Sequence, residues 1–156
     1  MQARAVLNRV EKPGRYVGGE WNHIDKSESF YKLDADERLH TAFCFPDLYE
    51  IGMSNLALQI LYQAINSEGK MFCERAFMPA PDMRAIMKDE NISLESIETG
   101  TALRDFDVLA FSLHYELSYS AVLEMLSLSG IPFYASERND TDPLVIAGGP
   151  ISCNLE

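Results

Sequence analysis

The residues of this chain that could do chemistry follow predicted strands. Asp47 comes just after an apolar run that ends at Phe45, Ser112 and His114 lie at the end of another, and Gly148-Gly149 ends a third. In an open α/β sheet, ligands bind at the carboxyl ends of the strands. A carboxylate, a hydroxyl, an imidazole and glycines that allow close backbone approach would together suit ligand binding there.

Each of these residues also has a plainer interpretation. Gly52, Gly148 and Gly149 could serve only tight turns, and Asp47 is a common turn residue. Ser112 could cap a helix or close its strand, and His114 could be a structural hydrogen-bonding group. The residues alone leave both interpretations open. Glu116 is expected to favour the N-terminus of the following helix electrostatically.

Motifs for nucleotide binding and catalysis are absent from the sequence. It has no GxGxxG, no GxxxxGK[ST] and no GxSxG, and it supports no Ser/His/Asp catalytic set. The cysteines Cys44, Cys73 and Cys153 are widely separated, so no disulfide framework, zinc site or iron–sulfur site is encoded locally. Cys44 and Cys73 are predicted to be buried free thiols in strands. We therefore predict no catalytic residue in this chain.

The hydrophobic pattern predicts strand–helix alternation. Strands are predicted at 39–45, 71–77 and 107–113, with a last one at 145–150 that runs into a glycine turn, and a short edge strand at 92–97. Helices are predicted after an N-cap at Ser54, from 79–82 onward, and over about 117–129. Residues 46–52 are predicted to form a loop, and residues 1–10 a short amphipathic helix.

Apolar side chains mark the faces of two of these helices. The first carries one apolar face, and the last is predicted to bury four apolar residues. The face of the first consists of Leu56, Ile60, Leu61, Ala64 and Ile65, and the buried set of the last is Val122, Leu123, Met125 and Leu126.

This alternation implies right-handed crossovers and a parallel sheet. We predict an α/β, Rossmann- or flavodoxin-like three-layer domain with four or five mostly parallel strands. Residues 1–36 are predicted to form an N-terminal arm, 37–154 the α/β domain, and 155–156 a cloning scar. Because a glycine turn after the last strand usually leads into another helix, we expect the domain to continue on its C-terminal side.

Composition limits the classes of partner. The 156 residues include 13 Lys and Arg against 24 Asp and Glu, for a net charge of −11, which disfavours nucleic acid and anionic membranes as partners. The N-terminus lacks the apolar core of a signal peptide, and no apolar run is long enough to span a membrane. A cytoplasmic protein is predicted.

The segments after the strands resemble the cobalamin (vitamin B12)-binding domain that precedes the catalytic domain of many radical S-adenosylmethionine (SAM) enzymes. That family has Asp-x-His-x-x-Gly after its first strand, Ser-x-Leu after the third and Gly-Gly after the fourth. Here these positions read Asp47-Leu48-Tyr49-Glu50-Ile51-Gly52, Ser112-Leu113-His114 and Gly148-Gly149. One uncharacterised radical SAM family is similar over nearly the whole chain, including 12–20, 45–55, 111–116 and 147–150.

The resemblance implies a cofactor site but no local iron–sulfur cluster. The cofactor-binding residues would be Asp47, Tyr49, Gly52, Ser112, His114, Gly148 and Gly149, with Ser112 beside the dimethylbenzimidazole tail of cobalamin. A [4Fe–4S] cluster and SAM would belong to a downstream domain with a CxxxCxxC motif, which is absent here. That downstream radical SAM domain would be the main partner, and a homodimer is a further expectation because a sheet edge can pair with another copy.

Two residues depart from the cobalamin pattern. Tyr49 replaces the histidine that would ligate cobalt, so cobalamin would bind base-off without that ligand, and His114 replaces the leucine of Ser-x-Leu. The main alternative is a docking or substrate-recruitment module that keeps the fold without the cofactor. A receiver-like signalling domain is disfavoured because Asp47 lacks a second acidic partner and the third strand ends in Ser112.

Overall fold

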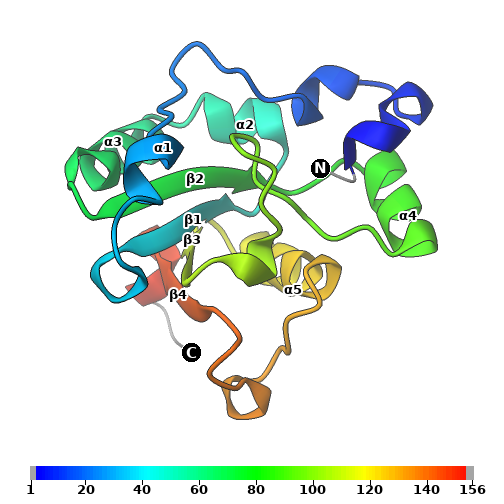
Figure 1. Ribbon diagram of the computed structural model, residues 1–156. Coiled ribbons are helices and arrows are strands. Elements are labelled where there is room, and N and C mark those ends of the chain that lie inside the picture. Colours follow the sequence, from blue (N-terminus) through cyan, green and yellow to red (C-terminus); the bar gives the residue numbers. More distant parts are fainter. Residues whose placement is uncertain (1–2, 154–156) are drawn as a thin grey trace.

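The computed structural model describes residues 3–153, with a four-stranded sheet at its centre (Figure 1). The strands are all parallel and run in the order β2-β1-β3-β4, which confirms the predicted α/β class. Their predicted positions differ from the observed bounds by only a residue or two. The bounds are β1 (Leu39–Phe45), β2 (Met71–Phe77), β3 (Val108–Ser112) and β4 (Leu144–Gly148).

Helices connect the strands and cover the sheet on both sides. The predicted helices after β1, β2 and β3 are confirmed as α3, α4 and α5, and the predicted N-terminal helix is a 3₁₀ segment, η1. The α-helices are α1 (Ser27–Phe30), α2 (Tyr49–Met53), α3 (Leu56–Ser67), α4 (Pro81–Glu90) and α5 (Leu117–Leu128). The 3₁₀ segments are η1 (Ala3–Arg9), η2 (Pro13–Tyr16), η3 (Ala35–Glu37), η4 (Leu103–Asp105), η5 (Ala135–Glu137) and η6 (Pro150–Cys153).

Alternation along the strands divides the core into two layers. Ala42 and Cys44 of β1 pack with the side chains of α4 and α5, and Phe43 and Phe45 pack on the opposite face with α3. The N-terminal arm adds Val6 to the α4–α5 layer. The result is a three-layer domain in which α3 covers β2 and β1, while β4 lies at the uncovered edge (Figure 1).

Two predicted boundaries near the end of β1 are wrong. Residues 49–52 of the predicted loop belong to α2 (Tyr49–Met53), and the N-cap of α3 is Asn55 instead of Ser54. The Asn55 side chain accepts a hydrogen bond from Leu58 N at 2.9 Å, whereas the Ser54 hydroxyl donates to Ile51 O and so belongs to the end of α2. Both residues are good capping types, so the sequence alone does not separate them.

The predicted edge strand at 92–97 is also wrong. Within this segment, Glu95 forms only an isolated antiparallel bridge with Ala102. Ile97 N donates to Arg75 O of β2, but the next contact is made by the Glu98 carboxylate in place of backbone. A carboxylate cannot continue a backbone ladder, so no strand develops.

Helix α3 turns a different face to the sheet from the one its apolar residues suggest. Leu58 and Tyr62 are buried, whereas Leu56, Ile60 and Leu61 are 72%, 58% and 44% exposed. Tyr62 is held inward by polar partners, because its hydroxyl accepts a hydrogen bond from Ile24 N. In α5, Met125 and Leu126 are buried as predicted, but Leu123 is 47% exposed.

Side chains close the outer edge of β2. Asn66 bonds both the N–H and the C=O of Cys73, at 3.0 and 2.9 Å. Glu98 accepts a hydrogen bond from Arg75 N, and its other oxygen accepts one from Arg75 Nε, both at 2.7 Å. An amide and a carboxylate thus take the place of a neighbouring strand.

A second buried carboxylate, Glu74, points to the other face of β2. It accepts hydrogen bonds from Ser96 Oγ and from the backbone and hydroxyl of Thr99, and it pairs with His40 Nε2 at 2.7 Å. Burial opposes ionisation of Glu74, but these hydrogen bonds lower its pKa overall. The two carboxylates fix the loop of residues 96–99 against the sheet.

The opposite pKa shifts of Glu98 and Glu74 predict a pH at which the free energy of unfolding is highest. Burial raises the pKa of Glu98 to about 7, against the opposing charge of Arg75, so folded protein binds this proton more tightly than unfolded protein. The free energy of unfolding that Glu98 contributes is therefore lost as pH rises from 4.5 through 7, by at most about 3 kcal/mol. The pKa of Glu74 is lowered, so its contribution is instead lost as pH falls below 4.5. Urea unfolding should show highest stability near pH 5, and E98Q should flatten the decline toward pH 8. A decline that E98Q leaves unchanged would contradict this role of Glu98.

The two cysteines of the strands, Cys44 and Cys73, are buried and free, as predicted. Burial raises both thiol pKa values, that of Cys73 to about 12. Residues 155–156, predicted to be a cloning scar, lie outside the described residues. Within residues 3–153, no helix combines the length and the apolar character that crossing a membrane requires.

Candidate functional site

An open apolar groove of about 400 Å³ lies at the carboxyl end of the sheet, on the face that α3 only partly covers. Four of the sequence-predicted site residues line it, namely Ser112, His114, Gly148 and Gly149. Ser112 and Gly148 are register partners on β3 and β4, which explains why residues 36 positions apart meet here.

A serine–histidine pair forms the polar part of the groove. Ser112 Oγ lies 2.8 Å from His114 Nε2. The His114 ring packs against Phe45, the last residue of β1, with ring centroids 5.1 Å apart. The imidazole of the β3 loop therefore lies over the end of the neighbouring strand β1.

The two glycines have different roles. A Cβ on Gly148 would have no atom within 4 Å, so this position opens onto free space. Gly149 has a φ of +129°, and a Cβ there would lie 2.2 Å from Leu113 O. Gly149 is therefore required by the turn, whereas Gly148 leaves room above the end of β4.

The apolar walls come from residues that the sequence pattern did not assign to a site. They are Phe43, Ala57, Leu61, Ala110 and Ile146, together with neighbouring groups of β3 and β4. The recurring apolar positions of α3 were the available signal. Those positions were assigned to a helix face, and one of them, Leu61, instead lines the groove.

Asp47 lies in a different depression, on the side of α4 and α5. Its carboxylate accepts hydrogen bonds from Tyr115 OH and from Leu48 N. The hydrogen bond to Asp47 raises the pKa of Tyr115. Asp47 thus ties the loop after β1 to the loop after β3 and does not line the groove.

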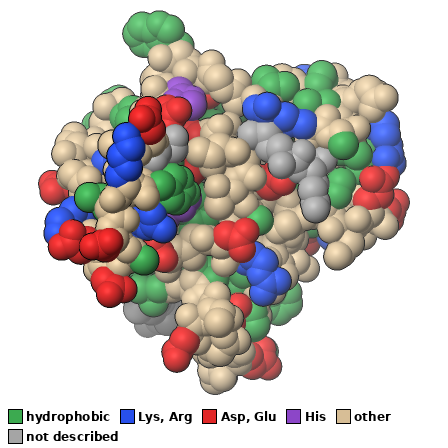
Figure 2. Space-filling model, in the orientation of Figure 1, with side chains coloured by type: hydrophobic (Ala, Val, Ile, Leu, Met, Phe, Trp, Pro, Cys, Tyr) green, Lys and Arg blue, Asp and Glu red, His purple; other side chains and the backbone are tan. Residues whose placement is uncertain are grey.

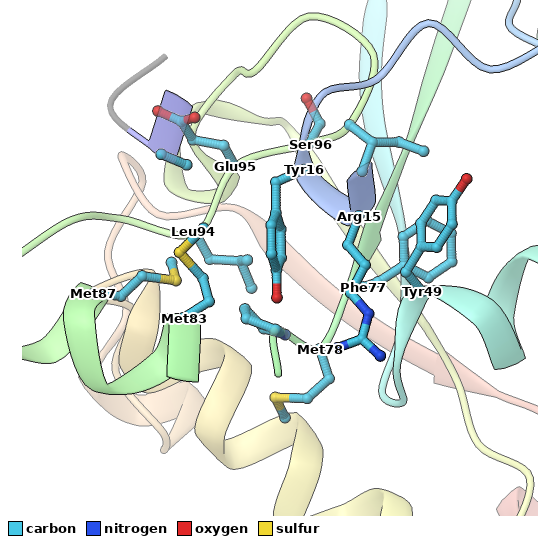
Figure 3. Close-up of a pocket in the computed structure, with 13 residues that line it drawn as sticks. Arg15, Tyr16, Tyr49, Phe77, Met78, Met83, Met87, Leu94, Glu95 and Ser96 are labelled. Carbon is cyan, nitrogen blue, oxygen red and sulfur yellow. The ribbon is translucent and has the colours of Figure 1, made fainter. Parts of the chain in front are cut away.

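Tyr49 and Gly52 are also directed elsewhere. Tyr49 packs edge-on against Phe77 and lines a small enclosed cavity of about 40 Å³ under the N-terminal arm (Figure 3). Burial and a hydrogen bond to Glu20 raise its pKa to about 12. A Cβ on Gly52 would lie 2.3 Å from the Phe77 ring, so Gly52 allows α2 to pack closely.

The arm itself closes the cavity that Tyr49 lines. Tyr16 stands in the middle of this cavity, opposite Met83 and Met87 of α4, and its hydroxyl accepts a hydrogen bond from Ala80 N at 3.0 Å (Figure 3). Arg15 pairs with Glu50 of α2 at 2.8 Å. The space of about 40 Å³ is far smaller than the groove of about 400 Å³, so the groove is the better candidate for a ligand.

Comparison with known families identifies the region that contains the groove. Residues 57–156 match the family described as "Radical SAM proteins, N-terminal". The chain belongs to this radical SAM N-terminal family. The match spans nearly two thirds of the sequence and includes the groove residues of β3 and β4 but not Asp47, Tyr49 or Gly52. Neither a curated protein nor a solved structure matches the chain.

Membership of the radical SAM N-terminal family raises the question of whether the groove fits cobalamin. The apolar walls and the free space at Gly148 suit a flat aromatic base, and the Ser112 hydroxyl can hydrogen-bond a base nitrogen. The position of the expected cobalt-ligating histidine does not fit, because Tyr49 faces the arm. Among residues 3–153, no three His, Cys, Asp or Glu side chains are gathered to hold a bare metal ion.

Proposed function

We propose that this chain is the cobalamin-binding domain of a radical SAM protein and holds the nucleotide tail of the cofactor in the groove. One observation carries the proposal. The Ser and Gly-Gly positions of the B12 pattern, far apart in sequence, meet across β3 and β4 around an apolar groove with open space at Gly148. Family membership supports the radical SAM context.

In this proposal the residues of the chain bind and orient the tail. Phe43, Leu61 and Ile146 would contact the faces of the base and exclude water from it, and Ser112 would fix its orientation through one hydrogen bond. The backbone at Gly148 would allow close approach. Bound cobalamin would supply a methyl group for transfer to an unactivated carbon, with the iron–sulfur cluster and SAM held by a downstream domain.

The test is cobalamin retention by the purified 156-residue chain, measured by visible absorbance after exhaustive dialysis. A Cβ at position 148 would meet no atom within 4 Å, so a larger side chain there would extend into the open groove, and G148W should weaken binding by about tenfold or more, about 1.4 kcal/mol. Dicyanocobinamide, which lacks the nucleotide tail, should bind more weakly than cobalamin and lose less of its binding in G148W.

Gly69 provides a matched control for this experiment. It is an exposed glycine, a Cβ added to it would have no atom within 4 Å, and it precedes β2 at the opposite end of the sheet. G69W should leave retention unchanged. Equal losses in G69W and G148W, or no retained colour at near-millimolar cobalamin, would refute the proposal.

A second candidate function is a docking or substrate-recruitment module without cofactor. The observation that favours it is the exposure of apolar side chains at the groove, namely Ile146 in its wall and Leu56 and Ile60 of the adjoining helix α3. In Figure 2, acidic and basic side chains are interspersed on the face shown and form no continuous basic patch. Failure to retain cobalamin would leave this candidate as the better explanation of the groove.

A further inference from the structure

The chain has three histidines, and they differ in which end of the sheet they lie near. His40 lies near the amino end of β1 and is buried against Glu74, and His23 belongs to the N-terminal arm. His114 alone of the three lies at the carboxyl end of the sheet, in the groove with Ser112 and Gly148.

The hydrogen bonding of His114 leaves one ring nitrogen available. When Nε2–H donates to Ser112 Oγ, Nδ1 carries the free lone pair, and no hydrogen bond to Nδ1 is formed within residues 3–153. The side chain is only partly buried, so a ligand can reach it. Histidines that ligate metals usually donate their other N–H to a fixed acceptor, which sets the tautomer. Ser112 is positioned to be that acceptor.

The position of the ring also matches the ligand that the loop after β1 lacks. Tyr49 begins helix α2 after β1 and faces the arm, whereas His114 follows the adjacent strand β3 and packs on Phe45 at the end of β1. An imidazole is thus present beside the end of β1, although it belongs to a different loop.

We infer that His114 is the axial nitrogen ligand of cobalt in the cobalamin-bound protein, through Nδ1, with Ser112 as the residue that positions it. This inference rests on the proposed function, because it requires cobalamin to bind in the groove. A corrin ring supplies the equatorial nitrogens itself, so one protein side chain completes the lower face and no cluster of protein ligands is needed.

The test is electron paramagnetic resonance of cob(II)alamin bound to the full chain. An axial ¹⁴N ligand splits each cobalt line into a triplet, and ¹⁵N gives a doublet. Protein labelled with ¹⁵N-histidine should therefore convert the triplet into a doublet, which distinguishes a protein imidazole from the cofactor's own unlabelled base. In H114L the splitting should disappear while cobalamin is still retained. Y49F should keep the full splitting, since Tyr49 faces away.

The possible outcomes distinguish failure of His114 ligation from failure of cobalamin binding itself. Cobalamin that is retained without nitrogen splitting, or with a triplet that labelling leaves unchanged, would overturn ligation by His114 but leave the proposed function standing. A doublet that persists in H114L would also overturn it. Absence of binding would overturn both.

Discussion

Replacing Arg75 by methionine is expected to lower the free energy of unfolding by about 3–5 kcal/mol near pH 8. The Arg75 and Glu98 side chains are 0% and 1% exposed and lie 2.7 Å apart, so removing one charge leaves the other buried without compensation. The guanidinium also bonds Asn22 and lies 4.2 Å over the ring of Tyr62. R75M therefore removes one ion pair and loosens the contact between the arm and α3.

A double replacement separates the effect of the buried charge on stability from the effect of lost packing. R75M/E98L removes both charges and should recover part of the lost stability, because a buried ion pair can often be exchanged for apolar groups. Urea denaturation of the two variants at pH 5 and pH 8 is the measurement. R75M should lose less at pH 5, where Glu98 binds a proton. A loss that is the same at both pH values and is not relieved by E98L would contradict the role given to the pair.

Replacing Gly149 by alanine is expected to destabilise the protein by about 2–4 kcal/mol. Its φ of +129° is a conformation that side chains rarely adopt, and the new Cβ would lie 2.2 Å from a backbone oxygen of Leu113. The backbone of Leu113 also makes a bond to β4, since Leu113 N donates to Gly148 O at 2.7 Å. Because the clashing atoms are backbone, the overlap can be relieved only if the end of β4 and the backbone of Leu113 move apart.

The neighbouring glycine gives the opposite expectation. G148A meets no atom within 4 Å and has no positive φ, so it should raise stability by up to about 1 kcal/mol through the unfolded state. Thermal or urea unfolding of G148A and G149A measures both. Similar losses in the two variants would show that the turn does not depend on Gly149 in the way described.

The alternation of strands and helices could be predicted because it depends on local apolar pattern. The four strands follow from short, mostly apolar segments, and their parallel direction follows from the helices between them. The orientation of α3 could not be predicted in this way. Apolar residues lie on more than one side of that helix, and hydrogen bonds to distant backbone groups determine its rotation. Ile24 N donates to the Tyr62 hydroxyl, and Cys73 N donates to the Asn66 side chain.

The candidate site was predictable to the extent that strand ends define it. Ser112, His114, Gly148 and Gly149 come together because their strands are adjacent and parallel. Sequence order alone places Asp47 and Tyr49 in the same group, because both follow β1. Helix α2 and the arm turn these two side chains to other faces, and contacts such as those of Tyr115 and Glu20 are not visible in a local pattern.

Because side chains close the outer edge of β2, a further strand can be added to this sheet at one edge only. Asn66, Ile97 and Glu98 already occupy the hydrogen-bonding groups of Cys73 and Arg75, so an incoming strand finds no free partner there. The edge of β4 pairs with no strand among residues 3–153 on its far side. Strand addition, from this polypeptide or from another, is therefore restricted to β4. Because β4 is also one wall of the groove, any structure that extends the sheet would reshape the entrance to the ligand site.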